Sequence, residues 1–231
     1  MAIGLVGSEM CIRDSNDSVP DAELEELMTK LTADTNNQVV VISGRGRDFL
    51  EKWLSKFNVD FIAEHGVWHK ENGKEWECFV ELDTSWQEEF DRVLEMYVDR
   101  TPGSFIERKD FSMVWHYRKV EPGLGELRSR ELANLLKYLS ADKDLQVQEG
   151  DMVIEIKNAR VNKGVAAASW LKKNDYDFSF ACGDDWTDED TFKAMPEDAF
   201  TVKVGSSSSA AKYRVENFKD IRKLLLSLAN Q

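Results

Sequence analysis

A run of four consecutive β-branched residues, 39–42, places the strongest limit on the folds open to this chain. β-Branched side chains favour strands, and an unbroken apolar run is typical of a strand that is buried on both faces. Such strands belong to parallel sheets that are covered by helices. Apolar residues recur at helical spacing before the run, at 24–31, and after it, at 49–57, and another short strand is expected at 60–63. The sequence therefore predicts an α/β core.

The pattern changes in the middle of the chain, where strand-like runs follow one another closely. These runs are 104–109, 111–118, 145–148 and 152–156, with helical patterns at 85–100 and 124–138. Strands this close in sequence pair as antiparallel hairpins. We therefore expect an inserted α+β module at 77–157, and a core made of 16–76 and 158–231.

The first fifteen residues do not resemble the rest of the chain. They are too short and too weakly charged for a signal peptide, and no helix or hairpin pattern follows them. Their sequence resembles translated sequencing-adapter DNA more than a native terminus. We expect residues 1–15 to be a non-native segment, with native-looking structure from about Val19.

Charge and cysteine content exclude several classes of function. Lys and Arg number 30 against 43 Asp and Glu, a net charge of −13, which argues against binding to nucleic acid or to an anionic membrane. An anionic substrate would need a metal ion or a local basic cluster. Cys11, Cys78 and Cys182 are far apart and have no metal-ligand spacing, so a reducing cytoplasmic location fits best.

An acidic segment follows a short apolar run that ends at Gly183. Its acids are Asp184, Asp185, Asp188, Glu189 and Asp190. Carboxylates beyond the carboxyl end of a buried strand can hold Mg²⁺, which prefers oxygen ligands and keeps water and phosphate in its shell. The alternative is a capping box of Thr187 and Asp190, with the acids solvated on the first turn of a helix.

Two other expected strand or helix ends carry groups that suit phosphate. Ser43, Gly44 and Arg45 offer a hydroxyl and backbone N–H groups where a helix begins. Lys163 precedes another helix and could neutralise phosphate as a compact charge. Each feature alone is also typical of a plain turn or a surface lysine. Their shared position at the carboxyl edge of one sheet favours a metal-assisted phosphate site.

Taken together, Ser43, Lys163 and the segment 183–188 resemble motifs II, III and IV of the haloacid dehalogenase-like phosphatases. The stretch 19–228 is similar to the trehalose-6-phosphate phosphatases, and looks most like the phosphatase half of two-domain trehalose-phosphate synthase/phosphatases. The segments that carry this resemblance are 63–66, 107–112, 115–118, 153–156, 162–164 and 183–190.

The resemblance implies a haloacid dehalogenase-like, Rossmann-like core with a cap that closes over a sugar. It implies Mg²⁺-dependent hydrolysis of trehalose 6-phosphate, in trehalose biosynthesis, and a fused or associated synthase domain as a partner. Lys163 and Ser43 would be catalytic, and Asp184 would bind the metal with Asp185 and Asp188 as outer support. The substrate-binding residues that it implies are Ser43, Gly44, Arg45, Glu64, His65, Gly66, Glu107, Lys109, Arg118 and Glu155. For the residues of the inserted module, the alternative is a solvated sheet face.

One departure from the family pattern concerns its first motif, Asp-x-Asp-Gly-Thr, which supplies the nucleophile and an acid/base. Neither Asp14 nor Asp17 follows an apolar strand or stands in such a motif. We therefore expect the central strand that carries the motif to be missing, and the chain as written to be nearly inactive. The alternatives are a related sugar phosphatase, such as one acting on sucrose 6-phosphate, and a non-catalytic sugar-phosphate-binding domain.

Overall fold

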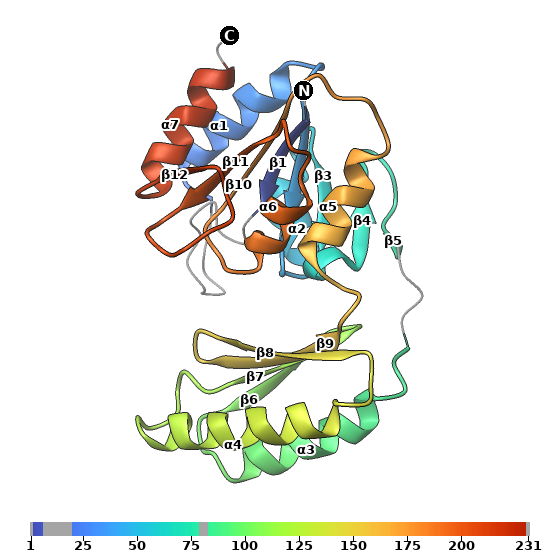
Figure 1. Ribbon diagram of the computed structural model, residues 1–231, viewed down its shortest axis with the longest axis vertical. Helices are drawn as coiled ribbons and strands as arrows, with labels where there is room; N and C mark the ends of the chain where they lie inside the picture. Colours follow the sequence, from blue (N-terminus) through green and yellow to red (C-terminus); the bar gives the residue numbers. More distant parts are fainter. Residues whose placement is uncertain (1, 7–19, 79–82, 230–231) are drawn as a thin grey trace. The chain divides into compact units, whose positions relative to one another are not determined.

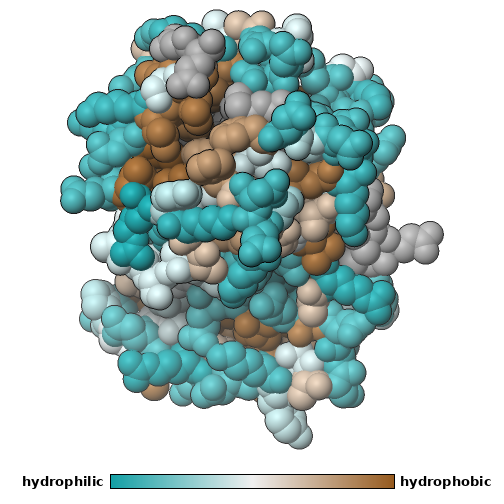
Figure 2. Space-filling model, turned by 45° about the horizontal axis from the view of Figure 1, so that its top comes forward, coloured by the Kyte–Doolittle hydropathy of each residue, from teal (hydrophilic) through white to brown (hydrophobic). Residues whose placement is uncertain are grey.

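The computed structural model describes residues 2–6, 20–78 and 83–229. It divides into two compact units (Figure 1). The core unit comprises Met1–Phe79 and Val161–Gln231, and the inserted unit comprises Val80–Arg160. The face of the molecule drawn in Figure 2 is mostly hydrophilic, in keeping with a chain in which 32% of the residues are charged.

The core unit is built on an eight-stranded sheet with the order β12-β11-β10-β1-β2-β3-β4-β5. The strands from β12 to β3 run parallel to one another, and β4 and β5 are antiparallel additions at one edge. Their bounds are β1 Ala2–Val6, β2 Gln38–Ile42, β3 Asp60–Ala63, β4 Trp68–Lys70, β5 Glu77–Cys78, β10 Ser179–Gly183, β11 Phe200–Val204 and β12 Tyr213–Val215. The predicted parallel α/β core is confirmed.

Strand β1 shows that one expectation was wrong. We expected the central strand of the sheet to be missing, yet Ala2–Val6 lies between β10 and β2 and pairs in parallel with both. The physical reason is that two neighbouring strands with open edges offer backbone donors and acceptors to any short apolar segment that can reach them. The sequence Ala-Ile-Gly-Leu-Val meets that need. The rest of the segment 1–15, including Asp14, lies outside the described residues, and so does Asp17.

Helices cover both faces of the core sheet and bury the apolar side chains on each side of β2. Val39 and Val41 pack into one cluster with residues of α1, α2 and α7, and Val40 and Ile42 pack into another with residues of α5 and α6 (Figure 1). The bounds are α1 Ala22–Ala33, α2 Arg47–Leu54, α5 Lys163–Leu171, α6 Asp188–Ala194 and α7 Phe218–Ala229, with the short 3₁₀ turn η1 at Glu64–Gly66.

A buried arginine joins the first and last helices of the core unit. Arg222 of α7 is 1% exposed, and its Nη1 atom donates to Asp21 Oδ2 at 2.8 Å and to Glu23 Oε2 at 3.0 Å. Asp21 is also the N-cap of α1, where its Oδ1 atom accepts from the Leu24 amide. The hydrogen bond from Arg222 lowers the pKa of Asp21 below its usual value.

The inserted unit is a four-stranded antiparallel sheet with the order β6-β7-β9-β8 and two helices on one face. Its elements are α3 Gln87–Asp99, β6 Phe105–Arg108, β7 Ser112–His116, α4 Leu124–Leu139, β8 Leu145–Gly150 and β9 Val153–Asn158. Alternate residues such as Trp115 and Ile154 pack with Phe90 of α3 and Leu136 of α4. The intervening residues form the second face of this sheet.

None of the helices within the described parts of the chain is long and apolar enough to cross a membrane.

We predict that the buried His69 makes the core unit sensitive to acid. His69 of β4 is 4% exposed, and its Nε2 atom lies 3.2 Å from the Gly66 carbonyl oxygen. Burial lowers the pKa of His69 to about 4. The unfolded chain takes up this proton first, near pH 6.5, so stability is full above that pH and falls as the pH drops toward 4. The loss is at most about 1.4 kcal/mol per pH unit.

The measurement is urea unfolding of the wild-type chain and of His69→Gln between pH 7.5 and pH 4.5. The wild-type free energy of unfolding should fall by about 2 kcal/mol more than that of the variant, which cannot titrate here. Equal losses in the two proteins would show that His69 is not responsible.

Candidate active site

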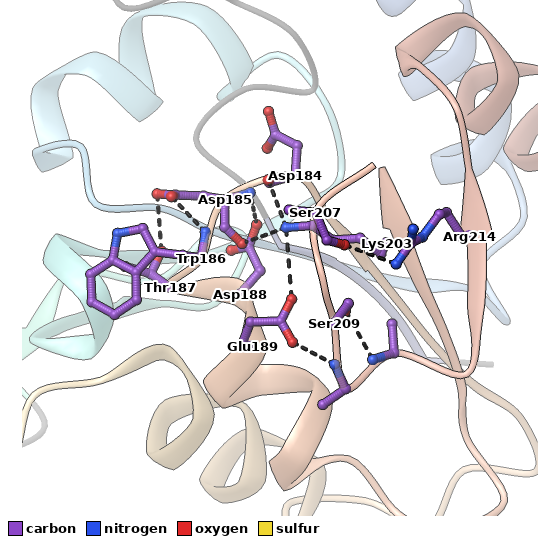
Figure 3. Close-up of polar contacts among 12 residues, drawn as sticks. Asp184, Asp185, Trp186, Thr187, Asp188, Glu189, Lys203, Ser207, Ser209 and Arg214 are labelled. Atoms are coloured by element: carbon purple, nitrogen blue, oxygen red, sulfur yellow. Dashed lines mark hydrogen bonds and ion pairs between the residues drawn. The ribbon is translucent and has the colours of Figure 1, made fainter. Parts of the chain in front are cut away.

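The loop between β10 and α6 is held by a buried ion pair. Lys163 Nζ, at the start of α5, lies 2.7 Å from Asp188 Oδ1 at the start of α6, and both side chains are 0% exposed. The other carboxylate oxygen, Asp188 Oδ2, accepts from the Asp185 amide at 2.9 Å (Figure 3). A Cβ atom at Gly183 would lie 2.2 Å from Asp188 Oδ2, so this strand end requires glycine. Strand, loop and both helices therefore meet at one carboxylate.

Asp185 serves the fold of the same loop. Its Oδ1 atom accepts from the Trp186 amide at 2.6 Å, and its Oδ2 atom accepts from the Thr187 hydroxyl at 3.2 Å. Thr187 occupies the N-cap position of α6 but makes no side-chain cap hydrogen bond. The capping box with Asp190, considered as an alternative from the sequence, is therefore not formed.

Asp184 is the acid of this loop whose carboxylate is turned outward (Figure 3). The residue is exposed. Even so, the surrounding protein partly desolvates its carboxylate. This desolvation, followed by the negative charge of Asp188, raises the pKa of Asp184 to about 6. A cation bound here would relieve the repulsion between the two carboxylates.

The three predicted metal-site residues thus differ in what their carboxylates do. Over the described residues, no group of three or more His, Cys, Asp and Glu side chains is arranged to hold a metal ion. Mg²⁺ needs only one or two protein carboxylates when water and substrate phosphate complete its octahedron. The available carboxylate of Asp184 fits that need, whereas Asp188 is paired with Lys163 and Asp185 binds within the loop.

Ser43 lies at the same edge of the sheet, directly after β2. Its amide donates to the Ile62 carbonyl oxygen at 2.9 Å, and its hydroxyl oxygen accepts from the Arg45 amide at 3.1 Å. β1 lies between β2 and β10, so Ser43 and Asp184 flank the carboxyl end of β1, about two strand spacings or 10 Å apart. The guanidinium carbon of Arg45 is 4.1 Å from the centre of the Phe49 ring.

The turn η1 presses against the loop of Ser43 in a strained conformation. Glu64 and His65 have positive φ angles of 50° and 59°, which residues other than glycine seldom adopt. The His65 amide donates to the Ser43 carbonyl oxygen at 3.0 Å, and the Glu64 amide donates to that of Arg45 at 3.1 Å. A Cβ atom at Gly44 would lie 2.5 Å from His65 Nε2. Strain of this kind persists where the surroundings enforce it, and it gathers at functional sites.

Gly66 links the same turn to the helix that carries Lys163. Its φ angle is 121°, and a Cβ atom there would lie 2.9 Å from the Ala166 Cβ atom and 3.1 Å from the Asn162 carbonyl oxygen. Asn162 is the N-cap of α5, where its side chain accepts from the Val165 amide. The structure therefore brings the predicted core residues 43–45, 64–66 and 163 to one edge of the sheet, with the acidic loop beside them.

The predicted residues of the inserted unit lie on or beside the sheet face that α3 and α4 leave open. Glu107 of β6 and Glu155 of β9 both pair with Val114 of β7, so the two carboxylates stand in one cross-strand row. Glu107 Oε2 lies 3.0 Å from His116 Nε2, and this hydrogen bond is the main reason that the pKa of Glu107 is lowered. Lys109 Nζ is 3.8 Å from Glu107 Oε1.

Arg118 binds a residue outside this row, Asp151. Its Nη2 atom donates to the Asp151 carboxylate at 2.8 Å and to the Asp151 carbonyl oxygen at 3.1 Å, at the turn between β8 and β9. The structure therefore joins Glu107 and Lys109, and aligns Glu155 with them, while Arg118 is held by an acid that the sequence did not indicate.

Sequence reasoning missed Lys203, which holds the acidic loop, and the contact between Lys203 and Glu189. Lys203 Nζ donates to the carbonyl oxygens of Asp184 and Asp185, and Glu189 Oε1 lies 3.7 Å from it (Figure 3). The lysine within the largely buried strand β11 was the available signal, because a charge on a strand of the sheet interior needs a specific partner.

We predict that Gly183→Ala disturbs this site. The new methyl group would displace the Asp188 carboxylate, so the free energy of unfolding should fall by about 2 kcal/mol or more. The control is Gly46→Ala, because no atom lies within 4 Å of a Cβ there. Since Gly46 is an N-cap, this control should cost about 1 kcal/mol or less. Chemical unfolding of both variants tests the difference, and an equal cost would argue against the tight contact.

Comparison with known proteins connects this geometry to a family. The family model for trehalose-phosphatases matches residues 8–219. The bifunctional trehalose-6-phosphate synthase/phosphatase of Thermoproteus tenax is 39% identical over 211 residues, which cover 91% of this chain and 29% of that protein. The chain spans less than a third of the length of the first curated relatives that it matches.

Solved structures agree with this assignment. The C-terminal domain of Candida albicans trehalose-6-phosphate phosphatase matches with a TM-score of 0.89 and 30% identity, covering 99% of this chain and 92% of that one. A haloacid dehalogenase-like hydrolase from Bacteroides thetaiotaomicron matches with a TM-score of 0.70 and 11% identity, over 98% of each chain, and so shares the fold. The chain belongs to the trehalose-phosphatase family and has the haloacid dehalogenase-like fold.

Proposed function

We propose that this chain is the phosphatase part of an enzyme that hydrolyses trehalose 6-phosphate to trehalose and phosphate. The observation that carries the proposal is the outward carboxylate of Asp184, beside the buried pair of Lys163 and Asp188 and on the same sheet edge as Ser43. The match of the family model to residues 8–219 supports the substrate.

The phosphate group would lie between the Ser43 loop and Lys163. Two guanidinium nitrogens of Arg45, Nε and Nη2, are buried and have no hydrogen-bond acceptor in the part of the chain that the structure describes. Buried donors of this kind are costly, and a phosphate oxygen would satisfy them. The Ser43 hydroxyl can donate to phosphate while it accepts from Arg45, and the Lys163 ammonium would offset the charge that develops on the phosphoryl oxygens.

Mg²⁺ would be held by Asp184, with Asp185 and Asp188 fixing the loop behind it. When bound, the cation would neutralise charge on the phosphoryl group and orient it for in-line attack. The contributions of the chain itself are structural: Lys163 holds the Asp188 carboxylate in place, and Asp188 holds the amide of Asp185. The loop is then rigid before the substrate arrives, which lowers the cost of reaching the transition state.

The sugar would be bound by the open face of the inserted unit, acting as the cap. Glu107, Lys109 and Glu155 would hydrogen-bond the hydroxyls, with Arg118 near the edge of that face. Hydrogen bonds from charged groups are stronger than neutral ones, which suits the recognition of a polyhydroxylated ligand. In the core unit, Glu64, His65 and Gly66 would also bind the substrate, beside the Ser43 loop.

The nucleophile is the part of the mechanism that this sequence lacks. Family members carry Asp-x-Asp-Gly-Thr at the end of the first strand, and here the residues that follow β1 are Gly7, Ser8, Glu9 and Met10. Without the first aspartate no aspartyl-phosphate can form, and without the second the leaving group has no general acid. We therefore propose that the chain as written is nearly inactive, although it keeps the phosphate and metal residues.

Restoring the motif tests this proposal. The changes Gly7→Asp, Glu9→Asp, Met10→Gly and Cys11→Thr place the family motif directly after β1. Phosphate release from trehalose 6-phosphate in the presence of Mg²⁺ should rise by about 10³-fold or more. The same four changes combined with Asp184→Asn are the control and should give no such rise. Equal turnover by the original and the restored chain would contradict the proposal.

The substrate is tested on the restored chain with trehalose 6-phosphate, sucrose 6-phosphate and p-nitrophenyl phosphate. Glu107→Gln should raise the KM for trehalose 6-phosphate by about tenfold, because a charge-assisted hydrogen bond is lost, and should leave p-nitrophenyl phosphate unaffected. Glu149→Gln is the matched control, since Glu149 forms a solvent-exposed ion pair with Lys137.

A preference for sucrose 6-phosphate would favour the alternative sugar phosphatase, and binding without turnover would favour a non-catalytic domain.

We also infer that a synthase domain, fused or associated, accompanies this unit, because the Thermoproteus tenax relative is named as a bifunctional synthase/phosphatase. A cytoplasmic location stays a prediction from the cysteine content of the sequence.

A further inference from the structure

A buried lysine lies directly behind the acidic loop. Lys203 belongs to β11, where it pairs with Gly183, the last residue of β10. It therefore stands beside the point at which the strand ends and the loop begins. The residue is 2% exposed, so its ammonium group has lost almost all contact with water. A buried charge is costly unless fixed partners replace that water.

The partners of Lys203 are peptide groups of the loop. Its Nζ atom donates to the Asp184 carbonyl oxygen at 2.7 Å and to the Asp185 carbonyl oxygen at 3.0 Å. Glu189 supplies the opposite charge, with Oε1 at 3.7 Å from Nζ, while its Oε2 atom accepts from the Ala210 amide at 2.6 Å. Figure 3 shows the Asp184 carboxylate directed away from Lys203, while its carbonyl group faces the ammonium.

These contacts differ in kind from those of Lys163. The ammonium of Lys163 binds the carboxylate of Asp188, whereas Lys203 binds backbone carbonyls of the loop. Two consecutive carbonyls that turn toward one point need a donor there, and a lysine has three donors on one atom. An apolar residue in this place would remove the lysine donor from both carbonyls and leave that of Asp185 with the longer hydrogen bond from the Asp188 amide, at 3.4 Å, so the loop would be held less firmly.

We propose that Lys203 is a positioning residue, which holds the peptide groups of Asp184 and Asp185 so that the Asp184 carboxylate faces the cation site. The effect on the cation rests on the proposed function, because it assumes that Asp184 is a metal ligand. The effect on the loop does not depend on that assumption. Glu189 balances the charge of Lys203 and fastens it to the first turn of α6.

The test compares Lys203→Met with the chain as it is. Methionine has a similar length but no donor and no charge. Amide hydrogen exchange in residues 184–188 should become about tenfold faster, as expected when hydrogen bonds worth about 1.4 kcal/mol are lost. Binding of Mn²⁺, followed by electron paramagnetic resonance, should weaken by a similar factor. Neither readout requires catalysis, so the missing nucleophile does not interfere.

Arg222→Met is the matched control, because it also removes a buried cation from the core unit, at 1% exposure and with two carboxylate partners. It should lower the melting temperature yet leave loop exchange and Mn²⁺ affinity as in the wild type. If Lys203→Met fails to fold, Glu189→Gln serves instead, and should speed loop exchange in the same direction by a smaller factor.

The outcomes separate the two proposals. Unchanged loop exchange in a folded Lys203→Met variant, or in Glu189→Gln when the first does not fold, would overturn the positioning role. An equal increase in the rate of loop exchange in Lys203→Met and Arg222→Met would also overturn the positioning role, because a general loss of stability would then explain the effect. A third outcome is that loop exchange is faster in Lys203→Met while neither this variant nor the wild type binds Mn²⁺. That result would support the contact of Lys203 with the loop and would refute Asp184 as a metal ligand.

Discussion

The buried ion pair between Lys163 and Asp188 is the interaction on which the rest of this site depends. Removing one partner of such a pair leaves an uncompensated charge in the interior, at a cost of about 3–5 kcal/mol. Here the pair also uses both carboxylate oxygens of Asp188, one for the ammonium and one for the Asp185 amide. Gly183 must then lack a side chain, because the carboxylate occupies that space. One contact thereby fixes the end of β10, the loop and the starts of two helices.

The second constraint is the close packing of backbone on backbone around η1. Two residues with positive φ angles, Glu64 and His65, donate their amides to the loop of Ser43, and Gly66 abuts the start of α5. The strain is sustained because three segments enforce it from different sides. The Ser43 loop and Lys163 are consequently parts of one rigid edge, although 120 positions separate them in the sequence. Such rigidity is what a phosphate site needs if its donors are to be in place before the ligand binds.

Much of this could be predicted from local patterns. The apolar run at 39–42 indicated a strand buried on both faces, and the side chains of Val39 and Val40 do pack into opposite clusters. Lys163, Ser43 and Asp184 were selected because they follow strand ends or precede helices, and the parallel order of the sheet places such ends together. The central strand was beyond this reasoning. β1 is defined by pairing with β2 and β10, and pairing depends on which neighbours have open edges, which no short pattern records.

The sequence by itself determined the residue types, the strand and helix ends that carry them, and the membership of the chain in its family. The tertiary structure decided which role each of four neighbouring acids takes. Asp188 binds Lys163, Asp185 caps its own loop, Glu189 faces Lys203 and Asp184 is left to face outward. The physical reason is that a carboxylate is assigned by the cation or amide that reaches it through space, and both lysines come from elements distant in the chain.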